Sequence, residues 1–90
     1  MVTPGRKKGT VRFAVTPGDG ARKVAVAADF TSWKPVPMKK QKDGTFVTIL
    51  PVSSTSCEYK FIIDDQWVAD PDNENRVMNP YGTLNSFAQL

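Results

Sequence analysis

Two tryptophans, Trp33 and Trp67, are the residues whose type and position most strongly suggest a binding surface in this chain. Both lie beside turn-forming residues rather than inside an apolar strand: Trp33 follows Thr31-Ser32, and Trp67 follows Asp64-Asp65-Gln66. A small domain usually buries its tryptophans, because each indole covers a large apolar area. Two indoles near loops therefore predict a flat aromatic surface. One face of a pyranose ring is lined with C–H groups that pack on such a plane, so a sugar is the expected ligand.

Three further side chains have the chemistry to complete a sugar site. Lys60 is expected in the middle of a strand, on the face opposite the aromatic core residues, and is therefore predicted to be exposed beside the sheet. Asn85, at the start of the last predicted strand, offers an amide donor and a carbonyl acceptor, which suits two neighbouring hydroxyls. Tyr81 adds a third ring with a polar tip. The predicted carbohydrate site consists of Trp33, Lys60, Trp67, Tyr81 and Asn85.

Each of these residues also has a structural explanation that the sequence leaves open. Trp33 could fold back as a loop plug, and Trp67 could cap one end of the domain; both roles are common for tryptophan. Lys60 could be an ordinary solvated lysine, Tyr81 a loop anchor, and Asn85 a cap where a turn meets a strand.

Catalysis requires groups that the chain lacks or does not bring together. It has no histidine, the commonest general base near neutral pH. The serines at 53–56 have no partner base, and Cys57 is expected to be a small core residue. Asp64 and Asp65 are adjacent on a turn, so their carboxylates should diverge rather than flank one glycosidic bond. The sequence therefore predicts a domain that is not an enzyme.

A metal site is not expected either. The sequence after the last aromatic strand is rich in the oxygen ligands that calcium accepts. Its spacing does not match an EF-hand loop, which needs a glycine at the sixth position and a later bidentate glutamate. We therefore predict an ordinary polar loop, and neither a metal nor a cofactor, for the cluster Asp70, Asp72, Asn73, Glu74 and Asn75.

Composition and charge narrow the class of protein. Ninety residues suffice for one domain, expected over residues 10–90, with residues 1–9 as a disordered basic tail. The net charge of +3 equals the contribution of Arg6, Lys7 and Lys8 in that tail, so the rest is neutral and nucleic acid is not an expected partner. No apolar run approaches the roughly 20 residues of a membrane span. A single cysteine fits a reducing cytoplasm.

The hydrophobic pattern predicts strands throughout and no helix. Apolar and polar residues alternate with a period of two in several short segments, and turn-forming residues separate them at intervals typical of a β-sandwich. Asp43-Gly44 is expected to close a hairpin, and Pro17–Gly20 to form a turn. Residues 71–83 are expected to form one long irregular loop. The predicted strands are 11–16, 23–28 at the centre of a sheet, 38–42, 45–50, 57–63, a short strand around Trp67, and 84–90.

Several motifs follow one another in the order of a known domain. Asp29-Phe30 is followed by Trp33; Glu58-Tyr59-Lys60-Phe61 is followed by Asp64, Trp67 and Asp70-Pro71; and the chain then reaches Gly82-Thr83-Leu84-Asn85. From about Thr10 to Leu90 the chain resembles the family 48 carbohydrate-binding modules. That family includes the glycogen-binding domain of the AMP-activated kinase β subunit and the N-terminal domains of glycogen-branching and debranching enzymes.

The resemblance implies an immunoglobulin-like (early-set) β-sandwich that binds α-1,4-linked glucan without catalysis. By position, Trp33, Trp67, Lys60 and Asn85 match the family's sugar contacts. Tyr81 stands where the kinase-type modules have a leucine that inserts into the glucan. In this chain an aromatic ring therefore takes the place of that aliphatic side chain. The resemblance further implies α-glucan polysaccharides or oligosaccharides as ligands, with a glycogen-metabolism enzyme or a kinase as protein partner.

Two other functions stay open at this point. The same fold could serve as a protein-interaction or regulatory scaffold module whose sugar site is vestigial. A nucleic-acid binder could instead use the three rings as base platforms together with the basic tail.

Overall fold

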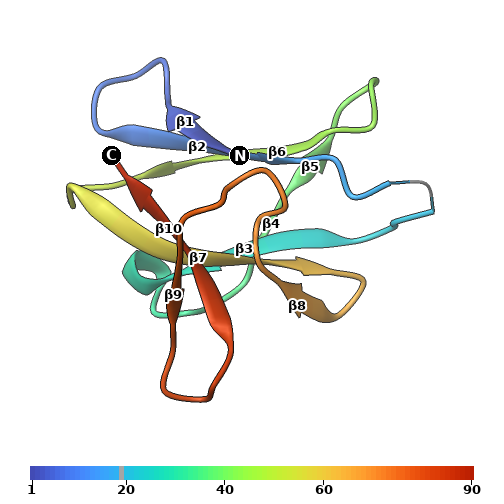
Figure 1. The fold of residues 1–90 in the computed structure, drawn as a ribbon. Coiled ribbons are helices and arrows are strands. Elements are labelled where there is room, and N and C mark those ends of the chain that lie inside the picture. Colours follow the sequence, from blue (N-terminus) through green and yellow to red (C-terminus); the bar gives the residue numbers. More distant parts are fainter. Residues whose placement is uncertain (19) are drawn as a thin grey trace.

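Two antiparallel sheets make up the fold in the computed structural model, which describes residues 1–18 and 20–90. One sheet has the order β1-β2-β6-β5; the other has the order β4-β3-β7-β10-β9, and β8 also pairs with β7 (Figure 1). A 3₁₀ turn, η1 (Asp29–Thr31), follows β3. The strands are β1 (Val2–Pro4), β2 (Thr10–Val15), β3 (Val24–Ala28), β4 (Val36–Pro37), β5 (Lys39–Lys40), β6 (Phe46–Pro51), β7 (Ser56–Ile63), β8 (Gln66–Val68), β9 (Arg76–Met78) and β10 (Leu84–Gln89). The predicted β-sandwich is confirmed.

The core lies between the sheets and follows from the period-two alternation of the strands. Phe13 on β2 faces Tyr59 on β7, with ring centroids 5.3 Å apart in an edge-to-face arrangement. Tyr59 in turn packs edge-to-face on Phe61 at 5.7 Å. Such pairs add attraction beyond the burial of their surface. Because Cys57, Tyr59 and Phe61 are buried in this core, the alternate residues of β7 face away from it.

The expected strand at 38–42 is divided between the two sheets. The amide of Met38 donates to the carbonyl of Val24 in β3 (2.9 Å), whereas Lys39–Lys40 pair with β6. The chain thus crosses from one sheet to the other at Met38, whose side chain is buried in the core. The hairpin predicted at Asp43-Gly44 joins β5 to β6 as expected.

Residues 1–9 differ from the expected disordered tail. β1 pairs with β2, which places Thr3 opposite Arg12, and Val2 packs against the core. Arg6–Lys8 therefore lie in a hairpin turn of the first sheet. A three-residue strand that contains a proline is too short to show alternation, so the sequence pattern gave no indication of it.

The stretch expected to be one irregular loop, residues 71–83, also differs, because it contains the edge strand β9. Val77 pairs with Asn85 and Met78 with Leu84, which makes β9 and β10 a hairpin. The predicted turn at Pro17–Gly20 includes residue 19, which lies outside the described residues.

Asp70 ties the loop after β8 to the core. Its carboxylate Oδ2 accepts a hydrogen bond from the Tyr59 hydroxyl at 2.6 Å, and Oδ1 accepts one from the Asp72 amide at 2.9 Å. The Asp70 amide donates to the Ser86 hydroxyl at 2.7 Å. Both carboxylate oxygens of this fully buried residue are therefore engaged in fixing the loop.

Within 1–18 and 20–90, no group of three or more His, Cys, Asp or Glu side chains converges as a metal site would require. No helix in the same part of the chain has the length and apolarity needed to cross a membrane.

Removing the Tyr59 hydroxyl should destabilise the fold. Tyr59→Phe removes the hydroxyl that donates to the buried Asp70 carboxylate, which keeps the Met1 ammonium (2.6 Å) and the Asp72 amide as partners. A hydrogen bond to a charged group contributes about 1.5–3 kcal/mol. We expect the free energy of unfolding in urea to fall by about that amount. Tyr81→Phe is the matched control, because Tyr81 is 90% exposed, and it should change stability by less than about 0.5 kcal/mol. Equal effects of the two substitutions would contradict this role.

Candidate functional site

Trp33 is held in place by a tightly bonded turn. The Thr31 hydroxyl accepts a hydrogen bond from the Ala28 amide (3.0 Å) and donates to the Ala28 carbonyl (2.9 Å), which stabilises η1. Ser32 and Trp33 then both adopt left-handed backbone conformations, with φ of 57° and 59°. This region is uncommon for a bulky residue and costs about 1–3 kcal/mol. The Trp33 amide donates to the Ala28 carbonyl at 2.9 Å. These hydrogen bonds hold the backbone of Trp33 in its strained conformation and thereby fix where the indole begins.

Trp67 is placed by the hairpin that joins β7 to β8. Asp64 and Asp65 have φ of 48° and 70°, the pattern of the two-residue turns that match strand twist. The Asp64 carboxylate accepts hydrogen bonds from the amides of Arg22 (3.0 Å) and Lys23 (2.9 Å). These two bonds, led by the one from Lys23, lower the pKa of Asp64 below its usual value. Asp64 thus has a structural role, because its carboxylate ties the β7–β8 turn to the residues that precede β3.

The floor between the tryptophans comes from β7 and β10. Trp67 is paired with Ile62, and residues 58, 60 and 62 alternate with the buried residues of β7, so Trp67 and Lys60 share the outer face. The register Ser86↔Tyr59 brings Asn85 beside Lys60. Asn85 is only 5% exposed and Lys60 only 9% exposed. The prediction that Lys60 is exposed is therefore wrong, and its ammonium donates to the Thr83 hydroxyl of the 79–83 loop at 2.8 Å.

Tyr81 sits at the tip of the β9–β10 hairpin, and Asn79 organises this tip. The Asn79 side-chain oxygen accepts hydrogen bonds from the amides of Tyr81 (3.0 Å) and Thr83 (3.1 Å). The Gly82 amide donates to the Asn79 carbonyl at 3.1 Å, and Gly82 has φ of 83°. A β-turn followed by a left-handed glycine is a common hairpin end. It projects the Tyr81 ring into solvent, where it is 90% exposed.

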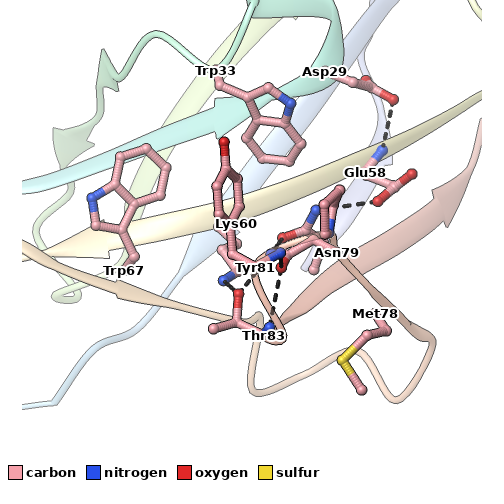
Figure 2. A pocket seen from close by; sticks show the side chains of 11 residues that line it. Asp29, Trp33, Glu58, Lys60, Trp67, Met78, Asn79, Tyr81 and Thr83 are labelled. Atoms are coloured by element: carbon pink, nitrogen blue, oxygen red, sulfur yellow. Dashed lines mark hydrogen bonds between the residues drawn. The ribbon is translucent and has the colours of Figure 1, made fainter.

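Hydrogen bonds link the polar side chains of the floor into one chain. The Asn79 side-chain nitrogen donates to the Thr83 hydroxyl (2.6 Å), which also accepts from Lys60, and to the Asn85 side-chain oxygen (3.0 Å). The Asn85 nitrogen donates to Glu58 Oε1 at 3.1 Å. Five side chains from β7, β10 and the 79–83 loop therefore fix one another, as the dashed lines in Figure 2 show.

These elements enclose a groove of about 690 Å³ on the outer face of the second sheet. In the view of Figure 2 the two indoles flank Lys60 and Tyr81. All five predicted residues line the groove, so the structure brings together Trp33, Lys60, Trp67, Tyr81 and Asn85. Trp33 is 36% exposed and Trp67 48% exposed, so part of each ring is accessible to a ligand. The other lining residues, which the sequence reasoning did not single out, are Asp29, Glu58, Met78, Asn79, Pro80 and Thr83.

Asn79 begins a turn motif that could have identified it from the sequence. Asn79-Pro80-Tyr81-Gly82 has the residue types favoured at the first, second and fourth positions of a β-turn. Glu58 gave no comparable indication, because its role depends on the register between β7 and β10.

Cys57 has the environment of a core residue, as predicted. It is 1% exposed, and burial, with a smaller effect from the Asp29 charge, raises the pKa of its thiol to about 12. A nucleophilic cysteine needs a lowered pKa and access to solvent, so Cys57 does not act as one.

Sequence comparison identifies a family. Residues 11–90 match the family described as "Glycogen recognition site of AMP-activated protein kinase". The chain is 32% identical over 71 residues to the pig 5'-AMP-activated protein kinase subunit beta-1, which covers 79% of this chain and 57% of that sequence. It is 35% identical over 73 residues to the mouse subunit beta-2, covering 80% of this chain and 26% of that subunit. The chain therefore spans only part of the relatives it matches.

Structural comparison supports the fold. A putative alpha amylase from Salmonella typhimurium superimposes with a TM-score of 0.75 at 23% identity, over 97% of this chain and 14% of that one. The maltogenic amylase from S. marinus gives a TM-score of 0.74 at 25% identity, over 90% of this chain and 13% of that one. In both, the similar region is a small part of a larger protein.

The role of Asn79 leads to a prediction about the Tyr81 loop. Asn79→Ala removes the acceptor for the Tyr81 and Thr83 amides, so their hydrogen exchange, measured by NMR, should become about 5–10-fold faster. Asn75→Ala is the matched control, since the hydrogen bonds of Asn75 run through its backbone. The control should leave both amides unchanged. Equal exchange in Asn79→Ala and the unsubstituted protein would show that other contacts order the loop.

Proposed function

The chain belongs to the family of glycogen-recognition modules of AMP-activated protein kinase, and on this basis we propose that it binds α-1,4-linked glucan. The observation that supports this most directly is the groove in which two exposed indoles flank a hydrogen-bonded polar floor. The family is a recognition module without catalytic function, in agreement with the prediction of a domain that is not an enzyme.

Stacking on the indoles supplies the apolar part of the proposed interaction. If each indole removes about 60 Å² of apolar surface from water, two contribute about 3 kcal/mol at 25 cal/mol per Å². Two or three hydrogen bonds add about 1 kcal/mol each, and the loss of rigid-body freedom offsets part of the total. The dissociation constant should then lie between about 10 µM and about 1 mM. Such weak binding suits a polymer that offers many sites.

The polar floor has hydrogen-bonding capacity left for sugar hydroxyls. An ammonium group has three donors, of which Lys60 uses one on Thr83. Glu58 Oε1 accepts from Asn85, and the second carboxylate oxygen of Glu58 is an acceptor on the same side of the sheet. A donor and an acceptor at the centre of the groove can bind adjacent hydroxyls of one glucose unit.

Tyr81 adds a third ring to the proposed site. It projects from the tip of the β9–β10 hairpin, and in the view of Figure 2 its ring lies between the two indoles, where a bound glucan can contact it. In this proposal the Tyr81 ring is a third platform.

The carboxylates of the groove have structural partners, which fits binding without turnover. Asp29 Oδ2 accepts a hydrogen bond from the Glu58 amide at 3.2 Å, and Glu58 in turn orients Asn85. A two-carboxylate hydrolase needs one of its acids to protonate the leaving oxygen. Here the two acids serve as acceptors that hold the floor in shape.

The relatives suggest the setting in which the module works. They are named as subunits of 5'-AMP-activated protein kinase, so we infer a kinase or a glycogen-metabolism enzyme in the cytoplasm as the protein partner. A scaffold of the same fold with an inactive sugar site is the competing function. Glucan binding by the isolated chain distinguishes the two.

Calorimetry with maltoheptaose tests the proposed function. The protein should bind maltoheptaose with the affinity given above and leave it intact, and binding should hardly change with salt because the ligand is neutral. Nucleic-acid binding would instead weaken steeply with salt.

Trp33→Ala and Trp67→Ala should each weaken maltoheptaose binding by about 10-fold or more, since about 1.5 kcal/mol of stacking is lost. The melting temperature should change little. No heat with any α-glucan at millimolar concentration would favour the scaffold function.

Lys60 offers a second test of the same groove. Lys60→Met keeps most of the buried aliphatic stem but removes the ammonium, and it should weaken maltoheptaose binding about 5–30-fold, the equivalent of about 1–2 kcal/mol. Lys34→Met is the matched control: Lys34 is exposed and does not line the groove, and its substitution should leave the affinity within about twofold. Unchanged affinity in Lys60→Met would limit Lys60 to a structural role.

A further inference from the structure

Charge is distributed unevenly between the two sheets. Residues 1–16 and 38–51, which contain the β1-β2-β6-β5 sheet and its two hairpin turns, have seven basic residues and one acidic residue, Asp43. The rest of the chain has five basic and eight acidic residues. The first sheet therefore has a net charge of +6 and the remainder −3, which together give the +3 of the whole chain. The basic residues of the first sheet are Arg6–Lys8, Arg12, Lys39, Lys40 and Lys42.

Strand register explains how these charges gather. The pairing of β1 with β2 attaches the Arg6–Lys8 turn to one end of the sheet, and the β5–β6 turn places Lys42 at the other end. Arg12 and Lys39 lie on its outer face, because Arg12 pairs with Ile49 and Lys39 with Val47, and both partners alternate with residues that pack on the core. We call this outer surface the basic face.

The centre of the basic face is aliphatic. Ile49 is 54% exposed beside Arg12, and Val47 next to it is partly buried. Both phenylalanines of the sheet, Phe13 and Phe46, are buried in the core, so the basic face has no aromatic ring. An apolar centre surrounded by charged residues has the layout of a protein–protein contact surface.

We propose that the basic face docks an acidic protein segment that places an aliphatic side chain on Ile49 and carboxylates on the surrounding lysines and arginines. This inference does not depend on glucan binding, because the groove lies on the outer face of the other sheet. The two ligands would occupy opposite sides of the sandwich and could be bound together.

Charge complementarity and the shape of the face favour this partner over other anionic ones. Single-stranded nucleic acid is usually held by stacking on aromatic side chains, which the basic face lacks. An anionic membrane attracts basic residues by charge alone, which gives no role to the exposed Ile49, whereas an acidic segment with an aliphatic side chain covers it.

Protection of the sheet edges explains only some of the lysines. Short edge strands with lysine or proline prevent pairing with other chains, and this accounts for Lys39, Lys40 and Pro4. It does not account for Arg12, which lies on the interior strand β2, or for the three basic residues of the β1–β2 turn. The same protected edges direct a partner to the face rather than to an edge.

Fluorescence anisotropy with a labelled peptide tests the proposal. The peptide is about twelve residues long, with glutamates around two leucines, and the matched peptide has glutamine in place of glutamate. We expect the acidic peptide to bind and to lose about 10-fold in affinity between about 50 and about 200 mM salt. The glutamine peptide should bind at least about 10-fold more weakly. Absence of binding by the acidic peptide at low salt overturns the proposal.

Charge-reversed variants locate the binding. The double variant Arg12→Glu/Lys39→Glu should weaken binding of the acidic peptide by about 10-fold or more. The control Lys23→Glu/Lys34→Glu makes the same change of net charge in the segments that flank β3 and β4, and it should weaken binding by less than about threefold. Equal losses in the two variants would indicate attraction by net charge alone and overturn the proposal. Circular dichroism confirms that both variants are folded. Ile49→Ser should also weaken binding of the acidic peptide, although it leaves the net charge of the protein unchanged.

Further measurements separate the basic face from the groove and from other ligands. Saturating maltoheptaose should leave peptide affinity within about twofold, and competition between the two would overturn the assignment to opposite faces. Tighter binding of phosphatidylserine vesicles or of single-stranded RNA than of the acidic peptide would assign the face to a different class of partner. Failure of maltoheptaose to bind would affect the proposed function and not this one.

Discussion

Strand β7 has to serve two surfaces at once, and the rest of the structure depends on this constraint. Successive side chains of a strand point to opposite faces, so a shift of register by one residue would exchange core and surface. Tyr59 and Phe61 fill the centre of the sandwich, while Glu58 and Lys60 form the floor of the groove. The packing that stabilises the domain therefore also fixes the height and direction of the polar side chains between the two indoles.

The groove combines a rigid floor with rings on separate supports. Its floor is a chain of hydrogen bonds that connects the buried Lys60 and Asn85 to the partly buried Glu58 and Asn79 and the exposed Thr83. The buried members of a polar network are favourable only when their hydrogen bonds are satisfied. Among the described residues, no buried side-chain nitrogen or oxygen lacks a partner. Trp33 and Tyr81 lie in two different turns, and Trp67 lies on the short strand β8 directly after a third turn. Their spacing is consequently set by three local structures, each built on its own hydrogen bonds.

Local patterns in the sequence predicted most of what is local in the structure. Alternation identified β2 and β7, a segment apolar on both faces identified β3, and the turn and loop signals delimited β6 and β10. Tryptophans beside turns led to the groove together with Lys60, Tyr81 and Asn85. The burial of Lys60 could not be predicted, because its environment includes Thr83, which lies 23 residues further along the chain. The same holds for β1, whose pairing depends on contacts with β2 rather than on its own composition. The family resemblance named the sugar contacts but gave no information about Asn79, whose function is to shape the turn beneath Tyr81.

The left-handed backbone at Trp33 has a kinetic consequence. The free-energy cost of this backbone conformation is met when the protein folds. The indole is therefore already in position when a ligand arrives, and association requires no slow rearrangement. With an association rate constant of about 10⁶ M⁻¹ s⁻¹ and millimolar affinity, a single contact would last about a millisecond. A chain that releases one segment this quickly can rebind the next at the high local concentration that a polymer provides. Residence on a branched particle would then be long even though every individual contact is brief.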